Sequence, residues 1–412
     1  MNIQGAGSAA RHADCPDRRP DSPPRAMRIA YVSETYPPEL NGVALTVERT
    51  VAHLRGRGHA VELIRPRQPG EERLDRPDEL RTAGCAIPVY RELRFGLATP
   101  GALRRRFAAS RPELVHLATP GPLAWAALAA ARALGIATSS DFRTNFHQYS
   151  RYYRVGFLAA PALALMRRFH NLTGRTFVPT QAVRRELAAA GFQRLSVVGR
   201  GVDTGRFSPA ARSAALRAVW QAEPASPVLL AVGRVAAEKN VELALRAFEA
   251  ARAAHPATRM VVVGDGPARA RLEAAHPGAR FVGVRSGADL AAHYASADVF
   301  VFPSLTDTFG NVVMEALASG LAVVSHDCAA ASEHVADGRS GVLVAPGDEA
   351  GFIAATAALA GDPARRAGLA AGAVAAARRA TWDEVLARFE TDLQDTLDAH
   401  EANSAAGLPL AA

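Results

Sequence analysis

Short runs of β-branched and aromatic residues alternate with longer amphipathic stretches along most of the chain. The runs are typical of buried parallel strands, and the stretches between them have the spacing of helices. The first unit has a strand at residues 28–33, a turn-rich loop, a helix that ends near Arg57 and a strand at residues 60–64. Strand, helix and strand in this order form a βαβ unit, so the pattern predicts a doubly wound α/β fold with parallel sheets.

The alternation continues in two blocks, separated by a break rich in glycine and proline at residues 199–209 that we interpret as a linker. Before the break we expect strands at 114–117, 136–140, 176–178 and 195–198, and helices near 121–134 and 180–190. After the break we expect strands at 227–232, 260–263, 280–282, 299–302, 321–324 and 341–344, with helices at 241–254 and 288–296.

Length and composition fit two domains. The chain has 412 residues, of which 49% are hydrophobic and 21% charged, and this is more chain than one core usually holds. We expect an N-terminal domain over residues 27–204 and a C-terminal domain over residues 205–380. Residues 1–26 and 399–412 show no periodic pattern and are predicted to be disordered tails, and Met27 is a second candidate start.

The positive charge indicates an anionic partner. The formal net charge is +8, and Lys239 is the only lysine among many arginines. Such a total suits nucleic acid, a phosphate-bearing substrate or a membrane surface. Nucleic acid ranks last, because the sequence has no zinc finger, aromatic RNA-binding motif or basic heptad helix. Residues 104–106, expected to open a short helix, and residues 149–168 are candidates for contact with anionic lipid; a solvated basic helix face is the alternative.

The number and spacing of the cysteines indicate the cellular compartment of the protein. Cys15, Cys85 and Cys328 are scattered and lack the spacing of metal ligands. An odd number of isolated cysteines suits a reducing cytoplasm. We therefore expect a cytoplasmic protein that can associate with the inner face of the membrane.

The stretch at residues 299–320 carries the strongest functional signal. A buried strand runs into a turn and then into a helix with Glu315 in its second turn. A helix start of this kind presents bare backbone N–H groups, which bind anions. Asp307 precedes these donors and Glu315 follows eight residues later, so two carboxylates flank a phosphate-sized space. The alternative is that Asp307 only caps the helix and Glu315 is solvated.

Two cations are predicted to reach the same space. Arg234 follows the first strand of the second block, and Lys239 stands at the start of the next helix. Arginine offers a planar fork to phosphate oxygens and lysine a compact point charge. We predict that this pair and the helix start at residues 309–311 bind one diphosphate. If the Arg–Lys pair is considered without the two carboxylates and the helix start, the alternative is that both residues are ordinary surface charges.

Polar residues gather near the carboxyl ends of strands in the first block, where doubly wound sheets bind ligands. We interpret them as a substrate pocket, although a single histidine there can be purely structural. The residues are His116, Asp141, Arg143, Asn145 and His147. Gly42 opens the first helix and would let a bulky anion approach. Its loop lacks the Gly-x-Gly-x-x-Gly fingerprint of dinucleotide-binding proteins. The alternative is that Gly42 is only a turn residue.

Together these motifs resemble retaining glycosyltransferases of family 4, which have the GT-B fold. The resemblance covers residues 27–397 in order, and the matching segments are 28–34, 41–43, 233–240, 263–267 and 303–316. Within the family, the phrases SDFRTNFH and SLTDTFGNVVMEALASG are similar to those of bacterial GDP-mannose-dependent α-mannosyltransferases that act on lipid acceptors.

The resemblance implies two Rossmann-like domains that face each other across a cleft, with a final helix at residues 381–398 that crosses back to the first domain. It implies that Arg234 and Lys239 hold the donor diphosphate, that Glu315 binds the ribose hydroxyls and that Asp307 contacts the donor sugar. The further donor-binding positions that it implies are Gly42, Gly233, Gly283, Val284, Arg285, Thr308, Phe309, Gly310, Asn311 and Val312.

The chain departs from the family pattern at two positions. The first carboxylate is usually a glutamate and is Asp307 here, one methylene shorter, which bears on the identity of the sugar. Many relatives carry a second histidine where this chain has Ala118. His116, Asp141 or His147 is expected to take its place beside the reacting sugar.

The function expected from this resemblance is retaining transfer of a hexose, mannose from GDP-mannose, to a hydroxyl of a lipid or glycan acceptor by front-side displacement. No metal or other cofactor is expected, because the sequence has no Asp-x-Asp pair and the cations and helix N-terminus can stabilise the leaving diphosphate. The alternatives are a UDP-sugar-dependent glucosyl or N-acetylglucosaminyl transferase, a nucleotide-sugar epimerase and a non-catalytic nucleotide-sugar-binding protein. A phosphorylase would need pyridoxal phosphate on a lysine, and the single lysine is already assigned to phosphate.

Overall fold

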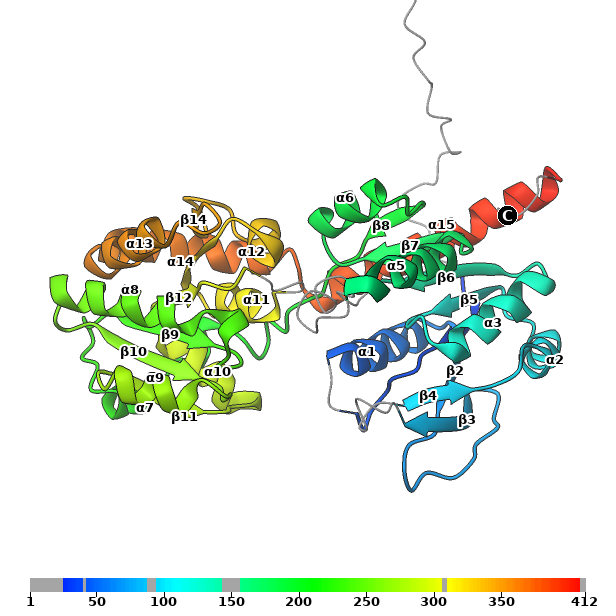
Figure 1. Cartoon of the computed structure of the whole chain (residues 1–412), viewed down its shortest axis with the longest axis horizontal. Helices are drawn as coiled ribbons and strands as arrows, with labels where there is room; N and C mark the ends of the chain where they lie inside the picture. Colours follow the sequence, from blue (N-terminus) through cyan, green and yellow to red (C-terminus); the bar gives the residue numbers. More distant parts are fainter. Residues whose placement is uncertain (1–24, 40–41, 87–93, 143–155, 306–309, 408–412) are drawn as a thin grey trace, which may run out of the picture.

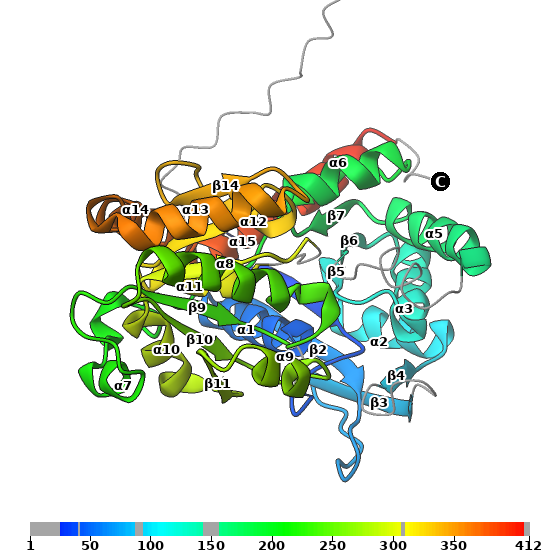
Figure 2. The ribbon, with the colours of Figure 1, turned by 60° about the vertical axis from the view of Figure 1, so that its left-hand side comes forward.

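The computed structural model shows two lobes side by side, each with a central sheet covered by helices (Figure 1). It describes residues 25–39, 42–86, 94–142, 156–305 and 310–407. Turning the molecule by 60° brings the second lobe in front of the first (Figure 2). Two α/β lobes with mainly parallel sheets confirm the predicted fold class.

The first lobe has an eight-stranded sheet in the order β4-β3-β2-β1-β5-β6-β7-β8, parallel except for the β3–β4 pair. Its strands are β1 Arg28–Val32, β2 Ala60–Pro66, β3 Glu79–Ala86, β4 Arg94–Leu97, β5 Leu114–Leu117, β6 Ala137–Asp141, β7 Arg175–Val178 and β8 Leu195–Val197. Its helices are α1 Gly42–Gly56, α2 Pro100–Ser110, α3 Pro122–Ala133, α5 Gly156–Asn171 and α6 Gln181–Ala189.

The second lobe has a six-stranded parallel sheet in the order β11-β10-β9-β12-β13-β14. Its strands are β9 Val228–Val232, β10 Arg259–Val263, β11 Ala279–Gly283, β12 Val299–Phe302, β13 Ala322–His326 and β14 Gly341–Val344. Its helices are α7 Ala214–Val219, α8 Val241–Ala254, α9 Arg269–Ala275, α10 Gly287–Ser296, α11 Asn311–Ala318, α12 Ala329–His334, α13 Glu349–Gly361 and α14 Pro363–Ala377.

The central strands of both sheets are buried on two faces, which explains their continuous apolar runs. In β12, Phe300 and Phe302 belong to one core cluster, and Val299 and Val301 belong to the cluster on the opposite face. The strand order of the second sheet reverses between β9 and β12. In open α/β sheets ligands bind at such a switch point, beyond the carboxyl ends of the strands.

The last helix, α15 (Trp382–Ala405), leaves the second lobe and runs along the first (Figure 1). Buried Glu390 accepts hydrogen bonds from His59 (2.9 Å) and Arg57 (3.1 Å), and Asp392 pairs with Arg175 at 2.6 Å. The prediction of a disordered tail from residue 399 is wrong as far as Ala405. His400 explains why the helix continues, since its ring nitrogen lies 2.8 Å from the carbonyl oxygen of Gly135.

Two further sequence predictions need correction in the first lobe. Strands β3 and β4 were not expected, because they form a largely half-exposed edge without a continuous apolar run. The three arginines at residues 104–106 lie in the middle of α2 and do not open it. The helix starts earlier because the Thr99 side chain accepts from the N–H of Ala102 and Pro100 occupies the first turn.

Candidate active site

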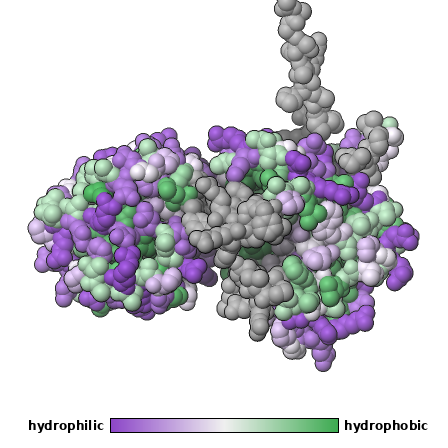
Figure 3. Space-filling model, in the orientation of Figure 1, coloured by the Kyte–Doolittle hydropathy of each residue, from purple (hydrophilic) through white to green (hydrophobic). Residues whose placement is uncertain are grey.

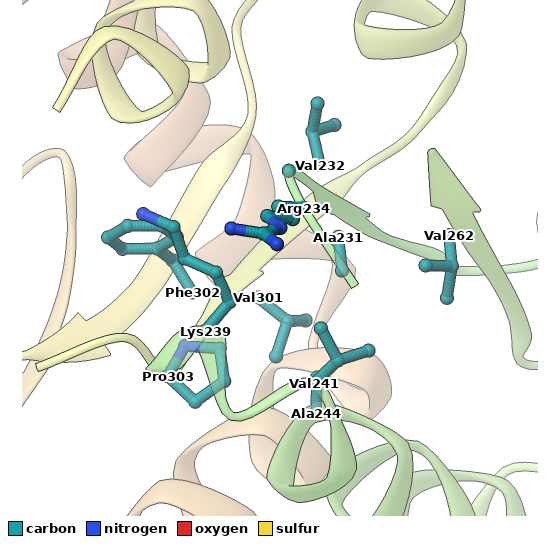
Figure 4. Close-up of a pocket in the computed structure, with 11 residues that line it drawn as sticks. Ala231, Val232, Arg234, Lys239, Val241, Ala244, Val262, Val301, Phe302 and Pro303 are labelled. Carbon is teal, nitrogen blue, oxygen red and sulfur yellow. The ribbon is translucent and has the colours of Figure 1, made fainter. Parts of the chain in front are cut away.

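Arg234 and Lys239 line one pocket at the switch point between β9 and β12 (Figure 4). Both side chains extend toward the same space over Phe302, and the Lys239 ammonium lies 5.9 Å from the centre of that ring. Arg234 is 68% exposed, and its Nη1 lies 3.7 Å from an oxygen of Glu238. The structure therefore brings the two predicted cations together on the open side of the sheet.

The connection from β9 to α8 explains this arrangement. Gly233 ends the strand with φ 147°, a conformation that favours glycine, and its carbonyl oxygen packs against the α-carbon of Gly264. A short 3₁₀ turn at Ala237–Lys239 follows, and Asn240 in the left-handed region leads into α8. This compact turn directs Lys239 back over the end of the sheet.

Glu315 lies in α11, which follows β12 across the same switch point. Burial raises the pKa of its carboxyl group to about 7, and the Tyr294 hydroxyl and the Arg206 guanidinium act in the opposite direction. A half-buried carboxyl group with such a pKa gains from ligand hydroxyls that donate hydrogen bonds to its ionised form. The alternative of a fully solvated Glu315 does not describe this position.

Only some of the other residues predicted at the start of this helix lie in the part of the chain that the structure describes. Gly310 precedes α11 with φ 61°, Asn311 is exposed and Val312 packs against the core. Asp307, Thr308 and Phe309 lie outside the described residues.

The predicted base-binding residues lie at the end of β11, on the same carboxyl edge of the sheet. Gly283 ends this strand with φ 77°, and Val284 is 72% exposed. The Arg285 guanidinium donates to the carbonyl oxygen of Val282 (2.7 Å) and lies 3.4 Å from Asp289. An exposed apolar side chain beside a held guanidinium plane is chemically suited to a flat base.

His116 and Asp141 require a correction, because the structure places both in the interior of the first lobe. Neither side chain is exposed to solvent, and their nearest nitrogen and oxygen lie 3.5 Å apart. The His116 ring packs against Tyr31 (4.6 Å) and against Phe389 of α15 (5.2 Å). Because neither side chain is accessible to a substrate molecule, we do not assign them to the substrate pocket. Arg143, Asn145 and His147 lie outside the described residues.

Sequence reasoning assigned no role to Glu34, although it lies only two residues after the end of β1. Its buried carboxylate accepts from the backbone N–H groups of Gly96 and, at 2.8 Å, of Leu123. Burial raises its pKa to about 7 against the effect of these donors. Glu34 thereby joins the ends of β1 and β4 to the start of α3. An acid placed two residues after a buried strand was the available signal.

Among the described residues, no group of three or more histidine, cysteine, aspartate or glutamate side chains could hold a metal ion. The positive charge at the pocket between β9 and β12 comes from Arg234 and Lys239.

Comparison with known proteins identifies the family. Residues 226–362 match the family described as glycosyl transferases group 1, and residues 40–206 match glycosyltransferase family 4. The chain is 38% identical to a GDP-mannose-dependent alpha-mannosyltransferase of Mycobacterium tuberculosis over 78% of this chain and 85% of that relative. A protein of the same description from Mycolicibacterium smegmatis is 37% identical over 89% of this chain and 98% of the relative.

The fold is also that of solved glycosyltransferase structures. The Anabaena protein HepE in complex with UDP superposes with a TM-score of 0.66 at 17% identity, over 90% of this chain and all of that structure. With two family matches that cover both lobes and relatives above 30% identity over most of its length, the chain belongs to the family 4 glycosyltransferases and is a glycosyltransferase with the GT-B fold.

Proposed function

We propose that the protein transfers mannose from GDP-mannose to a hydroxyl group of a lipid or glycan acceptor, with retention at the anomeric carbon. The convergence of Arg234 and Lys239 on one pocket carries the proposal, because this pair can grip the diphosphate of a nucleotide-sugar donor. The two mycobacterial relatives described as GDP-mannose-dependent support guanine and mannose as the donor groups.

The transfer we propose is a front-side displacement. The acceptor oxygen forms a bond to the anomeric carbon on the face from which the diphosphate departs, and a departing phosphate oxygen takes the acceptor proton. Negative charge grows on the diphosphate as its bond to the sugar breaks. Arg234 and Lys239 stabilise this charge, and the removal of one such group typically costs about 3–4 kcal/mol of transition-state stabilisation. We propose that these cations make a metal ion unnecessary.

Carboxylates orient the donor in this proposal. Glu315 accepts hydrogen bonds from the ribose hydroxyls, and Asp307 contacts the sugar. Gly310, Asn311 and Val312 offer backbone groups at the start of α11, and Val284 and Arg285 lie against the base. Gly42 in the first lobe faces the donor phosphates.

A ligand screen separates the candidate donors. A nucleotide at a hundred times its dissociation constant stabilises the folded protein by about 2.7 kcal/mol, so melting temperatures measured with GDP, UDP, ADP and dTDP should rank the bases. We expect the largest rise with GDP. A clear preference for UDP would instead support the glucosyl or N-acetylglucosaminyl alternative, for which the UDP complex of the structurally similar HepE is the motivation.

An acceptor-dependence assay separates the classes of function. A transferase releases GDP from GDP-mannose in proportion to added acceptor. An epimerase would convert the sugar without this dependence, and a binding protein would release none. GDP release that does not respond to any lipid or glycan acceptor would contradict the proposal.

We also propose peripheral contact with an anionic membrane through α5. This helix exposes Leu163 (36%) and Leu165 (55%), with the exposed Arg167 and Arg168 in the next turn. On the face in Figure 3, hydrophobic and hydrophilic residues are mixed over both lobes. No helix in the described ranges is long and apolar enough to cross a bilayer.

Sedimentation with liposomes tests this contact. We expect binding to vesicles that contain anionic lipid, with a loss in the double variant Leu165→Ser/Arg168→Glu. The matched control is Arg104→Glu/Arg105→Glu on α2, where Arg106 is already held by Glu62 and Asp75 at 2.6 Å. Equal sedimentation with neutral and anionic vesicles would contradict the proposal.

A further inference from the structure

We propose that Arg200 is a positioning residue that holds the start of α1 against the donor diphosphate and ties it to the connection between the lobes. This inference rests on the proposed function, in which Gly42 faces the donor phosphates. Figure 1 shows α1 beginning on the side of the first lobe that faces the second lobe. Arg200 lies between β8 and the second lobe, where the chain crosses from one sheet to the other.

The contact between Arg200 and Gly42 is close and specific. The Arg200 side chain is buried, and its Nη2 donates to the carbonyl oxygen of Gly42 at 2.5 Å. A Cβ atom added at Gly42 would lie 2.8 Å from Nη1 and 3.1 Å from Nη2. The planar guanidinium therefore lies against the glycine α-carbon, a fit that a lysine cannot reproduce.

The chain around Arg200 is fixed to the second crossing between the lobes. The N–H of Val202 donates to the carbonyl oxygen of Ala380 at 2.9 Å, and Val202 pairs with Thr381 in a parallel bridge. A Cβ atom at Gly201 would lie 2.3 Å from the α-carbon of Trp382, so the two crossings are in close contact.

Helix α1 contacts this junction a second time, through Arg49. Its guanidinium lies 5.0 Å from the centre of the Trp382 ring and 3.8 Å from Asp203. Helix α1 is therefore joined to the junction at two places, the Arg200–Gly42 contact and the Arg49–Trp382 contact. A change in the angle between the lobes therefore shifts the Gly42 end of α1, and Arg200 sets its position when donor binds.

Two substitutions probe the contact from opposite sides. Gly42→Ala introduces a methyl group where the guanidinium lies, at a position whose φ is compatible with alanine. Gly42 is exposed at the first residue of α1 and the clash is with the end of a flexible side chain, so this variant should still fold. We expect its KM for GDP-mannose and its Kd for GDP to rise about tenfold or more with little change in kcat. Arg200→Ala should have a similar effect, and Arg200→Lys should not restore the affinity.

The double variant Gly42→Ala/Arg200→Ala gives the decisive measurement. The three atoms nearest to the added methyl group all belong to the guanidinium, so once this group is gone Gly42→Ala should have much less effect. Gly56→Ala is the matched control on the same helix, because nothing lies within 4 Å of its Cβ position, and it should retain normal KM. An unchanged KM in Gly42→Ala, or an equal effect with and without Arg200, would overturn the inference. If Arg200→Ala does not fold, Gly42→Ala in the Arg200→Lys background gives the same comparison, since lysine also lacks the guanidinium.

The same assays separate this inference from the proposed function. Arg234→Ala should weaken GDP binding whatever the role of Arg200. If Arg234→Ala and Lys239→Ala leave GDP binding unchanged, the proposed donor site fails. If they weaken it while both Gly42→Ala and Arg200→Ala bind GDP normally, only the positioning role of Arg200 fails.

Discussion

The carboxyl ends of strands carry polar residues in both lobes, but the two sets have opposite environments. At the end of β9, Arg234 is 68% exposed and lines an open pocket with Lys239. In β5, His116 is fully buried beneath Phe389 of α15, and Asp141 at the end of β6 is also fully buried. The comparison teaches that a polar residue at the end of a parallel strand becomes a binding residue only where no other element covers it.

The two environments also differ in what their charges can do. An exposed cation meets an anion at small desolvation cost, whereas a buried polar group depends on partners within the protein. His116 is restrained by Ser139, whose hydroxyl lies 3.0 Å from Nδ1, and by the rings around it. The His116 ring packs beneath α15, while Arg234 and Lys239 line the open pocket.

Phe389→Ala should produce the largest effect in the buried region. Truncation of a fully buried phenylalanine leaves a cavity over His116 and should lower the free energy of unfolding by about 3–5 kcal/mol. Denaturant unfolding followed by circular dichroism measures the loss. Leu45→Ala, at a position 50% exposed in α1, is the control and should cost far less. Equal losses in the two variants would contradict the buried role of Phe389.

Lys239→Ala should produce the largest effect in the open region. We expect the turnover number to fall about 10²–10³-fold, because the variant loses one of the two cations that we propose stabilise the leaving diphosphate. The melting temperature should hardly change.

Arg246→Ala is the matched control for this substitution. Arg246 lies on α8 in the same lobe and forms a surface ion pair with Glu349 at 2.6 Å, so its removal should leave turnover unchanged. Near-normal transfer by Lys239→Ala in a product assay would contradict the assignment of the open pocket.

Gly121→Ala should have a smaller effect, at the edge of the first lobe where Glu34 joins β1 to α3. A Cβ atom there would lie 2.2 Å from a Glu34 carboxylate oxygen, so we expect a loss of about 1–3 kcal/mol in the free energy of unfolding. Gly101→Ala in α2 meets nothing within 4 Å and should cost nothing. Similar unfolding curves for the two variants would show that Glu34 adapts freely.

The pH dependence of Glu315 should give the smallest effect. Its pKa is raised from 4.5 to about 7, so the folded protein binds this proton more tightly than the unfolded chain does. The stabilisation is therefore complete below the unfolded pKa and is lost as pH rises through about 7. The melting temperature of the wild type should fall relative to that of Glu315→Gln as the pH rises from about 5 to about 8. Glu34 also has a pKa of about 7, but it is present in both proteins and cancels. A constant difference would contradict the raised pKa.

The sequence by itself determined the order and kind of most elements. Apolar runs such as β12 must be buried on both faces, and they alternate with helical spacing, so a pair of parallel α/β sheets follows from local pattern alone. The meeting of Arg234 and Lys239 was also predictable, because both lie in one short turn after a strand and are close in sequence.

Only the tertiary structure decided which polar residues are covered and which are open. His116 and Phe389 are far apart in sequence, and no local pattern reports that a returning helix closes over the end of β5. The edge strands β3 and β4 and the contact of Arg200 with Gly42 likewise depend on long-range packing. Local periodicity shows which face of its helix or strand a residue lies on. Whether a distant element covers that residue depends on the path of the whole chain.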